Sequence, residues 1–210
     1  MGEKFSLKEK KILAVEGNDE KNFFGAFFKY LNLEKIQIVD IGGKEKFKSD
    51  FPLIYSMENF KNITHIGFIR DAEKNPAQSA FDSISKILKD HKLPVPKSIN
   101  TIIKNDNISV GIFIMPDNQN EGMLETLCLQ SIENNPVKSC IDHFHICFES
   151  ILSENEKSVF NIQKSKVQAY LATRAPIVKS LGEAAQKKYW DFNHTCFDQI
   201  KQFLTDLFCE

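Results

Sequence analysis

The chain has 210 residues, of which 42% are hydrophobic and 26% charged, and a formal net charge of −1. This length suits one globular domain that can bury a sizeable core. The balanced charge excludes a strong overall attraction to nucleic acid, so any such binding must rely on local patches, metal ions or a partner.

Four short apolar runs in the first 120 residues have the pattern of buried β-strands. They span residues 12–15, 36–41, 65–69 and 109–115. Segments with helical periodicity follow the first three, which implies a parallel sheet with right-handed crossovers. The stretch over 97–107 fits no single pattern.

The helices expected between these strands each carry one apolar face. The first, over 20–31, repeats phenylalanine at helical spacing. The second, over 45–55, is expected to be disturbed at Pro52, because proline cannot donate a helical hydrogen bond. The third begins at Asn75-Pro76 and ends near residue 93.

From residue 121 onward the pattern predicts helices only. They span 123–131, 136–152, 159–173 and 193–208. We therefore predict an α/β fold with a mostly parallel four-stranded sheet flanked by helices over 1–130. A helical extension over 131–210 is expected to pack on it as one compact unit.

The location of the protein is suggested by what its sequence lacks. The five cysteines form no Cys-x-x-Cys pair, which disfavours a zinc ribbon and suits reduced thiols. The first residues, MGEKFSLKEKK, lack the apolar core of a signal peptide, and no apolar run approaches the roughly 20 residues of a membrane span. We therefore expect a cytoplasmic protein with no membrane partner.

Acidic residues follow three of the four predicted strands, at the edge where the carboxyl ends of parallel strands meet. They are Glu16 with Glu20, Asp71 with Glu73, and Asp117 with Glu125. Crowded carboxylates raise each other's pKa, and a bound divalent cation relieves the repulsion. Mg²⁺ fits best, because it prefers oxygen ligands and keeps water and substrate phosphate in its shell. Two such ions, roughly 3.5–4 Å apart, would clamp the attacking and leaving oxygens of a phosphodiester.

Three of these acids, Glu20, Asp71 and Glu73, also have an ordinary structural explanation. Glu20 falls in a first helical turn, where the helix dipole favours it, and Asp19 is a candidate helix cap. Asp71 and Glu73 stand beside basic residues, which fits a solvated ion cluster. The coincidence of acids at three strand ends favours a metal site. Glu16, between a strand and a glycine, is the hardest of them to explain as an ordinary solvated surface residue.

Three motifs carry a resemblance to a known family. They are Val-Glu-Gly-x-x-x-Glu after the first strand, Asp-x-Glu after the third, and Gly-x-x-Glu at Gly122 to Glu125. This pattern resembles the Toprim domain, a metal-binding α/β unit of topoisomerases, primases and overcoming-lysogenisation-defect (OLD) nucleases. The phrases GIFIMPDNQNEGMLETL and KVQAYLAT resemble short standalone Toprim-related proteins of the domain-of-unknown-function 3226 type.

The resemblance implies roles for the acids. Glu16 takes the place of the Toprim glutamate, a general acid/base or metal ligand. Glu20 falls where nuclease relatives have Asp, Asp71 and Glu73 match an Asp-x-Asp pair, and Glu125 matches the later acidic ligand. We therefore expect Glu16 and Asp71 to be catalytic and all five acids to bind Mg²⁺ or Mn²⁺. The two Glu-for-Asp replacements keep the charge but lengthen a ligand, which could shift the metal geometry.

Basic residues and histidines add further candidates. Lys44, after a glycine pair, could help hold phosphate, although such a pair is more often a tight turn. The resemblance implies a late basic residue that Lys166 or Arg174 could supply. The lysines at 44, 46 and 48, and at 164 and 166, could form a track for a phosphate backbone, although scattered lysines are usually solvated. His143 and His145 point to different sides of a helix, so we expect no metal there.

These expectations favour a Toprim-type, Mg²⁺-dependent, nuclease-like protein that cleaves DNA or RNA. The resemblance also implies phage defence with a separate ABC-type ATPase as partner, and a homodimer is left open. The alternative is a non-catalytic Toprim-like module that binds metal or a partner. A receiver-like domain phosphorylated at Asp71 is a third hypothesis, disfavoured because no fifth strand ends in lysine. A topoisomerase or primase is disfavoured because the chain has no room for a tyrosine-bearing domain and no zinc module.

Overall fold

A five-stranded sheet forms the centre of the molecule, in a computed structural model that describes residues 6–43, 46–105 and 107–209. The strands are β1 (Lys11–Val15), β2 (Ile36–Asp40), β3 (His65–Asp71), β4 (Ile102–Lys104) and β5 (Ser109–Met115). Their order is β2-β1-β3-β5-β4. All neighbours are parallel except β4, which runs antiparallel to β5. The predicted α/β class with a mostly parallel sheet is confirmed, with one edge strand more than expected.

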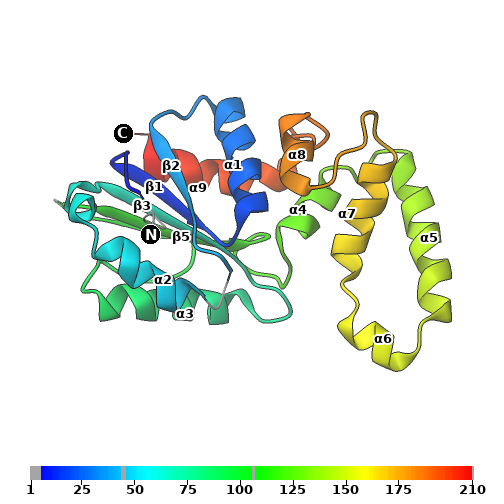
Figure 1. The fold of residues 1–210 in the computed structure, drawn as a ribbon, viewed down its shortest axis with the longest axis horizontal. Helices are drawn as coiled ribbons and strands as arrows, with labels where there is room; N and C mark the ends of the chain where they lie inside the picture. Colours follow the sequence, from blue (N-terminus) through cyan, green and yellow to red (C-terminus); the bar gives the residue numbers. More distant parts are fainter. Residues whose placement is uncertain (1–5, 44–45, 106, 210) are drawn as a thin grey trace.

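Helices cover both faces of the sheet (Figure 1). On one face lie α1 (Asn18–Leu31) and α9 (Asp198–Phe208), and on the other lie α2 (Lys46–Tyr55) and α3 (Ala77–Asp90). Side chains of a strand point alternately to the two faces, so each strand contributes to both cores. In β1, for example, Leu13 packs toward α1 and α9, whereas Ile12 packs toward α2 and α3.

Two glycines in the central strands let α9 lie close to the sheet. Gly67 of β3 and Gly111 of β5 are paired in register. A Cβ at Gly67 would lie 2.9 Å from Leu207 Cδ2, and one at Gly111 would lie 2.8 Å from Phe203 Cε2. Both distances are far below van der Waals contact, so these positions exclude larger side chains and make the last helix part of the sheet's packing.

The helices after the sheet include an arm at one side of the molecule (Figure 1). They are α4 (Leu124–Gln130), α5 (Val137–Ile151), α6 (Glu154–Val159), α7 (Ile162–Ala172) and α8 (Leu181–Gln186). The arm consists of α5 and α7, joined by α6. His145 is buried between them: its Nδ1 lies 2.9 Å from the Ile141 carbonyl oxygen and its Nε2 lies 2.9 Å from Ser165 Oγ. This histidine therefore joins two helices.

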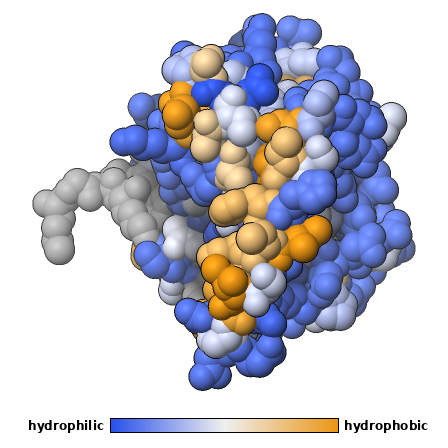
Figure 2. All heavy atoms as spheres, turned by 90° about the vertical axis from the view of Figure 1, so that its right-hand side faces the viewer, coloured by the Kyte–Doolittle hydropathy of each residue, from blue (hydrophilic) through white to orange (hydrophobic). Residues whose placement is uncertain are grey.

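The outer side of the arm is apolar. Figure 2 faces this side and shows hydrophobic side chains gathered along it. The large apolar residues of α5 and α6 that are exposed are Phe144, Ile146, Ile151 and Val159. No helix among the described residues is both long enough and apolar enough to cross a membrane.

Helix α8 packs on α1 through a contact between residues far apart in the chain. The carboxylate of Asp19 accepts the backbone N–H groups of Leu181 at 3.2 Å and of Gly182 at 2.6 Å. Asp19 thus satisfies the first N–H groups of α8, so the expectation that it caps its own helix was wrong. Helix α1 begins after Gly17 with no side-chain cap.

Helices α2, α6 and α8 differ from the sequence prediction. Helix α2 continues through Pro52 to Tyr55, although we expected a disturbance there. The short helices α6 and α8 were not predicted. The boundary placed at residue 130 between sheet domain and helical extension stays a prediction.

Candidate functional site

Four acidic side chains lie at the carboxyl end of the parallel strands. Glu16 directly follows β1, Asp71 ends β3, and Glu20 and Glu125 lie in the first turns of α1 and α4. All four are partly buried. A Cβ at Gly17 would lie 3.0 Å from Glu20 Oε2, so the glycine lets that carboxylate fold back over the turn. The chain thus brings these four predicted residues to one edge.

Two hydrogen bonds link the strand ends to one another. Glu16 Oε1 accepts the backbone N–H of Asp71 at 3.1 Å. Asp71 Oδ1 accepts the backbone N–H of Leu124, the first residue of α4, at 3.1 Å. Each carboxylate therefore holds the next element in place and retains a second oxygen for other contacts.

Burial and mutual repulsion make these carboxylates hard to ionise. Burial raises the pKa of Glu16 from its ordinary value of 4.5 to about 7, against the lowering effects of the Asp71 N–H and the Arg70 charge. The pKa of Asp71 is raised well above 3.8, first by burial and then by the charges of Glu16, Glu125 and Glu20. Burial is also the main reason that the pKa values of Glu20 and Glu125 are raised. A cation at this edge would relieve both causes.

Arg70 is the base closest to this cluster. Its Nε lies 3.6 Å from Glu16 Oε1, too far for a hydrogen bond, and the two side chains are only 14% and 15% exposed. Arg70 Nε and Nη1 are both buried without a hydrogen-bond partner. A cavity of about 190 Å³, lined by Arg70, Asp71, Glu73, Asn75 and Ser79 among others, opens beside them. A guanidinium group whose N–H donors lack a hydrogen-bond partner at a cavity suits an anionic ligand such as a phosphate.

Lys164 and Lys166 of α7 have different partners, and Lys166 is not the one that faces the acids. Lys166 Nζ donates to Asp142 Oδ1 at 2.8 Å and so ties α7 to α5. Its neighbour Lys164 instead faces the acids, with Nζ 4.0 Å from Glu125 Oε1, and is 64% exposed. Arg174 stacks on the rings of Tyr170 and Tyr189. Lys164 is therefore the late base that the fold brings to the acidic edge.

The other two candidate acids, Glu73 and Asp117, lie in segments held by backbone or local hydrogen bonds. The strand ends at Asp71, so Glu73 does not continue it; Glu73 has a φ of 58° and exchanges backbone hydrogen bonds with Gly122. Glu73 does lie close enough for its charge to raise the pKa of Glu16. Asp117 accepts the N–H groups of Gln119 and Asn120 within its own turn, and these bonds lower its pKa. Lys44 lies outside the described residues.

The acids suit a hard divalent cation by donor chemistry, because all of their ligating atoms are carboxylate oxygens. In the part of the chain that the structure describes, however, no three Asp, Glu, His or Cys side chains are spaced closely enough to hold one ion. An ion held by three or more of these carboxylates would therefore require them to draw together, whereas Mg²⁺ can also be held by one or two carboxylates with water in the rest of its shell.

Comparison with known proteins places the chain in a family. The family model described as "Protein of unknown function (DUF3226)" matches residues 10–209. The chain belongs to this family. No curated protein matches it.

Two solved structures are similar, both of the C-terminal region of the Xanthomonas campestris pv. campestris OLD protein. The one phased with iodine is 14% identical and has a TM-score of 0.47, with 96% of each chain covered. The one phased with mercury is 13% identical and has a TM-score of 0.40, covering 98% of this DUF3226 chain and 91% of that chain.

Sequence reasoning named Arg70 only as a member of a solvated ion cluster, and Lys164 only as part of a possible track for a phosphate backbone. The signal for Arg70 lies in the strand register: Ala14 pairs with Phe68, so two residues further along Glu16 stands beside Arg70. Neighbouring strands place such residues within reach of each other. No comparable signal marks Lys164, because the rotation of α7 about its axis depends on its packing against α4 and α5.

Proposed function

We propose that this DUF3226 protein is a Toprim-type, Mg²⁺- or Mn²⁺-dependent protein that cleaves phosphodiester bonds of DNA or RNA. The observation that carries the proposal is the convergence of Glu16, Glu20, Asp71 and Glu125 beside the unpaired buried nitrogens of Arg70. Carboxylates for a cation next to donors for an anion form a pair of sites that phosphoryl chemistry uses.

The residues of the site have separate roles in this proposal. A pKa of about 7 would let Glu16 accept and return a proton near neutral pH. Arg70 would donate from Nε and Nη1 to a phosphate oxygen in the adjoining cavity. Lys164, exposed at the other side of Glu125, would contact a neighbouring phosphate. The carboxylates would hold the metal, which when bound supplies positive charge and lowers the pKa of a bound water.

Cleavage assays test this function directly. Purified protein would be incubated with supercoiled DNA, linear DNA and single-stranded RNA in Mg²⁺, Mn²⁺ or EDTA. We expect cutting only with metal, and a loss of at least a hundredfold in Asp71→Asn. The matched control is Asp90→Asn, since Asp90 is exposed at the end of α3, on the face away from α1 and α9. Cutting that persists in Asp71→Asn would reject the assigned site.

A non-catalytic metal- or partner-binding module is the second candidate. Its support is that no three ligands are pre-assembled among the described side chains, together with the Glu residues that stand where nuclease relatives have Asp. Titration calorimetry with Mg²⁺ and Mn²⁺ separates the two candidates. Metal binding that depends on Asp71, without cleavage of any nucleic acid, would favour the module.

The cellular setting is proposed from the family resemblance alone. It would be phage defence with a separate ABC-type ATPase as partner, and the protein could act as a homodimer. A pull-down from the native host that recovers no ATPase would count against the partner. Light scattering of the purified protein would measure its oligomeric state.

A further inference from the structure

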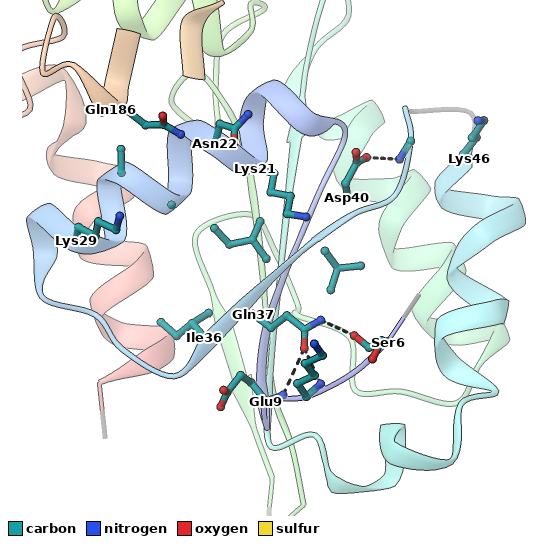
Figure 3. A pocket seen from close by; sticks show the side chains of 16 residues that line it. Ser6, Glu9, Lys21, Asn22, Lys29, Ile36, Gln37, Asp40, Lys46 and Gln186 are labelled. Atoms are coloured by element: carbon teal, nitrogen blue, oxygen red, sulfur yellow. Dashed lines mark hydrogen bonds between the residues drawn. The ribbon is translucent and has the colours of Figure 1, made fainter. Parts of the chain in front are cut away.

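A groove of about 880 Å³ runs along the outer edge of β2. All five residues of β2 line it, with α1 on one side and the segment 6–9 together with the start of α2 on the other (Figure 3). Its side-chain lining includes residues from both faces of β2, so the groove follows the edge of the strand rather than one face of the sheet. The groove therefore lies along one edge of the sheet.

Within the described part of the chain, no strand pairs with the backbone of β2 on this side. Among the described strands, only β1 pairs with β2. The Ile41 N–H donates to the Val15 carbonyl oxygen at 2.9 Å, so Ile41 faces β1. Alternate residues of a strand direct their backbone groups to opposite sides. The N–H and C=O groups of Ile36, Ile38 and Asp40 therefore point into the groove, where they can pair with another strand.

The walls of the groove are positively charged. Lys8, Lys21, Lys29 and Lys46 line it and are exposed. None of these four lysines forms an ion pair with a described carboxylate. Two acids, Glu9 and Asp40, also line it, and an oxygen of Asp40 already accepts the Gly42 N–H at 2.7 Å. The lining thus favours a negatively charged occupant.

Small residues keep the α1 wall open. Gly25 and Ala26 face the groove in the middle of a 14-residue helix. Glycine in a helix interior is unfavourable, yet a Cβ at Gly25 would meet no heavy atom within 4 Å. The internal packing of the chain therefore does not require glycine at this position. The missing side chain leaves space beside Ile36 and Ile38 for side chains of an added strand.

We propose that the outer edge of β2 binds an extended, acidic segment of a partner protein, which joins the sheet as a further parallel or antiparallel strand. Main-chain hydrogen bonds to Ile36, Ile38 and Asp40 would provide affinity. Apolar side chains of the segment would pack beside Gly25 and Ala26, and its acidic side chains would meet the four lysines.

A peptide fits this groove better than a nucleic acid does. Unpaired N–H and C=O groups alternate along β2, and another peptide backbone complements both kinds of group. No aromatic side chain lies among the groove's described lining residues to stack on a base. The proposal does not depend on the acidic site, and its outcome leaves the nuclease hypothesis untouched.

Fluorescence anisotropy with a labelled nine-residue peptide of alternating valine and glutamate tests the proposal. We expect saturable binding to the full chain. We also expect at least tenfold weaker binding to Gly25→Leu, which fills the slot, and to Lys21→Glu/Lys29→Glu, which reverses the charge. Lys86→Glu/Lys89→Glu on α3, exposed on the other side of the sheet, is the matched charge control and should bind as the wild type does. Thermal unfolding checks that each variant folds.

Two further probes identify the mode of binding. The same peptide methylated at every backbone nitrogen cannot donate to a strand edge, so we expect no binding. A peptide of alternating valine and lysine should bind at least tenfold more weakly. Equal binding of the methylated peptide, or unchanged binding to Gly25→Leu, would overturn the proposal. A thymidine oligonucleotide that competes with the peptide, and whose binding is lost in Gly25→Leu, would also overturn the proposal. The groove would then be a binding site for nucleic acid.

Discussion

Glu16 is held between opposing electrostatic effects. It accepts one backbone N–H and stands 3.6 Å from the Arg70 guanidinium, and both contacts favour its charged form. Burial opposes them and is the larger effect, so its pKa rises to about 7. Most paired carboxylates in proteins have depressed pKa values, so this glutamate is held in a state that stabilises a proton or a cation rather than a free charge.

This raised pKa predicts that the metal-free protein is more stable in acid than in weak base. Glu16 binds its proton more tightly when folded, so its contribution is full below pH 4.5 and is lost as the pH rises through about 7. The loss is on the order of 3 kcal/mol. Urea unfolding at pH 5 and pH 8 in EDTA measures it. Glu16→Gln should show a smaller pH dependence than the wild type, and an equal dependence would assign the effect to other groups.

Metal should restore the stability lost at high pH. If the carboxylates bind Mg²⁺ or Mn²⁺ only in the folded state, metal at a hundred times its dissociation constant stabilises the protein by about 2.7 kcal/mol. We expect this increase at pH 8 in the wild type and in Asp90→Asn. It should be absent in Asp71→Asn. An increase of the same size in Asp71→Asn would place the ion elsewhere.

At the scale of elements, two glycines predict opposite effects of the same substitution. A Cβ at Gly182 of α8 would lie 2.5 Å from Asn22 Cβ and 2.6 Å from the Asp19 carbonyl oxygen. Gly182→Ala should therefore separate α8 from α1 and destabilise the fold by about 1–3 kcal/mol. Gly25→Ala adds its methyl group to open space and should stabilise by about 0.5–1 kcal/mol. Urea denaturation of both variants measures the difference, and destabilisation of equal size would contradict the packing described.

The elements that could be predicted from the sequence are those with strong periodicity. The runs that became β1, β2, β3 and β5 are apolar and bounded by turns, and the phenylalanine spacing of α1 indicates a helix. The three-residue strand β4 and the six-residue helices α6 and α8 are too short to show a period. Helix α8 depends on tertiary contacts, such as the Asp19 carboxylate that receives its start. Helix α6 buries no residue and is held by a local capping box between Ser153 and Glu156.

The site was partly predictable for a related reason. The carboxyl ends of parallel strands share one edge, so Glu16 and Asp71 could be placed together without a structure. Which lysine faces them depends on the rotation of α7 about its axis. In the structure Lys164 faces Glu125, whereas Lys166 pairs with Asp142. Asp117 follows a strand as well, but it bonds within its own turn, and local hydrogen bonding of this kind competes with any role at the edge.

For the whole molecule, α9 links the end of the described chain to the central sheet. Its apolar residues Phe203 and Leu207 fill the space above Gly111 and Gly67. A fragment of residues 1–130 should therefore not fold cooperatively. Each large side chain of α9 that is lost removes about 1.5–3 kcal/mol of burial. Helix α9 has five buried ones, while total stabilities are about 5–15 kcal/mol.

Urea unfolding and near-ultraviolet circular dichroism of the fragment and of the full chain check this expectation. The fragment should lose the sharp transition and the near-ultraviolet signal of the full chain. A sharp transition in the fragment would instead support a self-sufficient domain that ends at residue 130.

The position of α9 also means that, during synthesis, the sheet is complete before the helix that covers part of it has been made. All five strands have been made once the ribosome passes Met115, but α9 begins only at Asp198. At about 5–20 residues per second, roughly 4 to 17 s separate these two moments. During that interval the part of the sheet that α9 later covers, around Gly67 and Gly111, presents its apolar side chains to the surroundings of the ribosome. Pulse-chase proteolysis of the nascent chain would show resistance only after residue 208 has emerged, and earlier resistance would mean that another segment shields this face first.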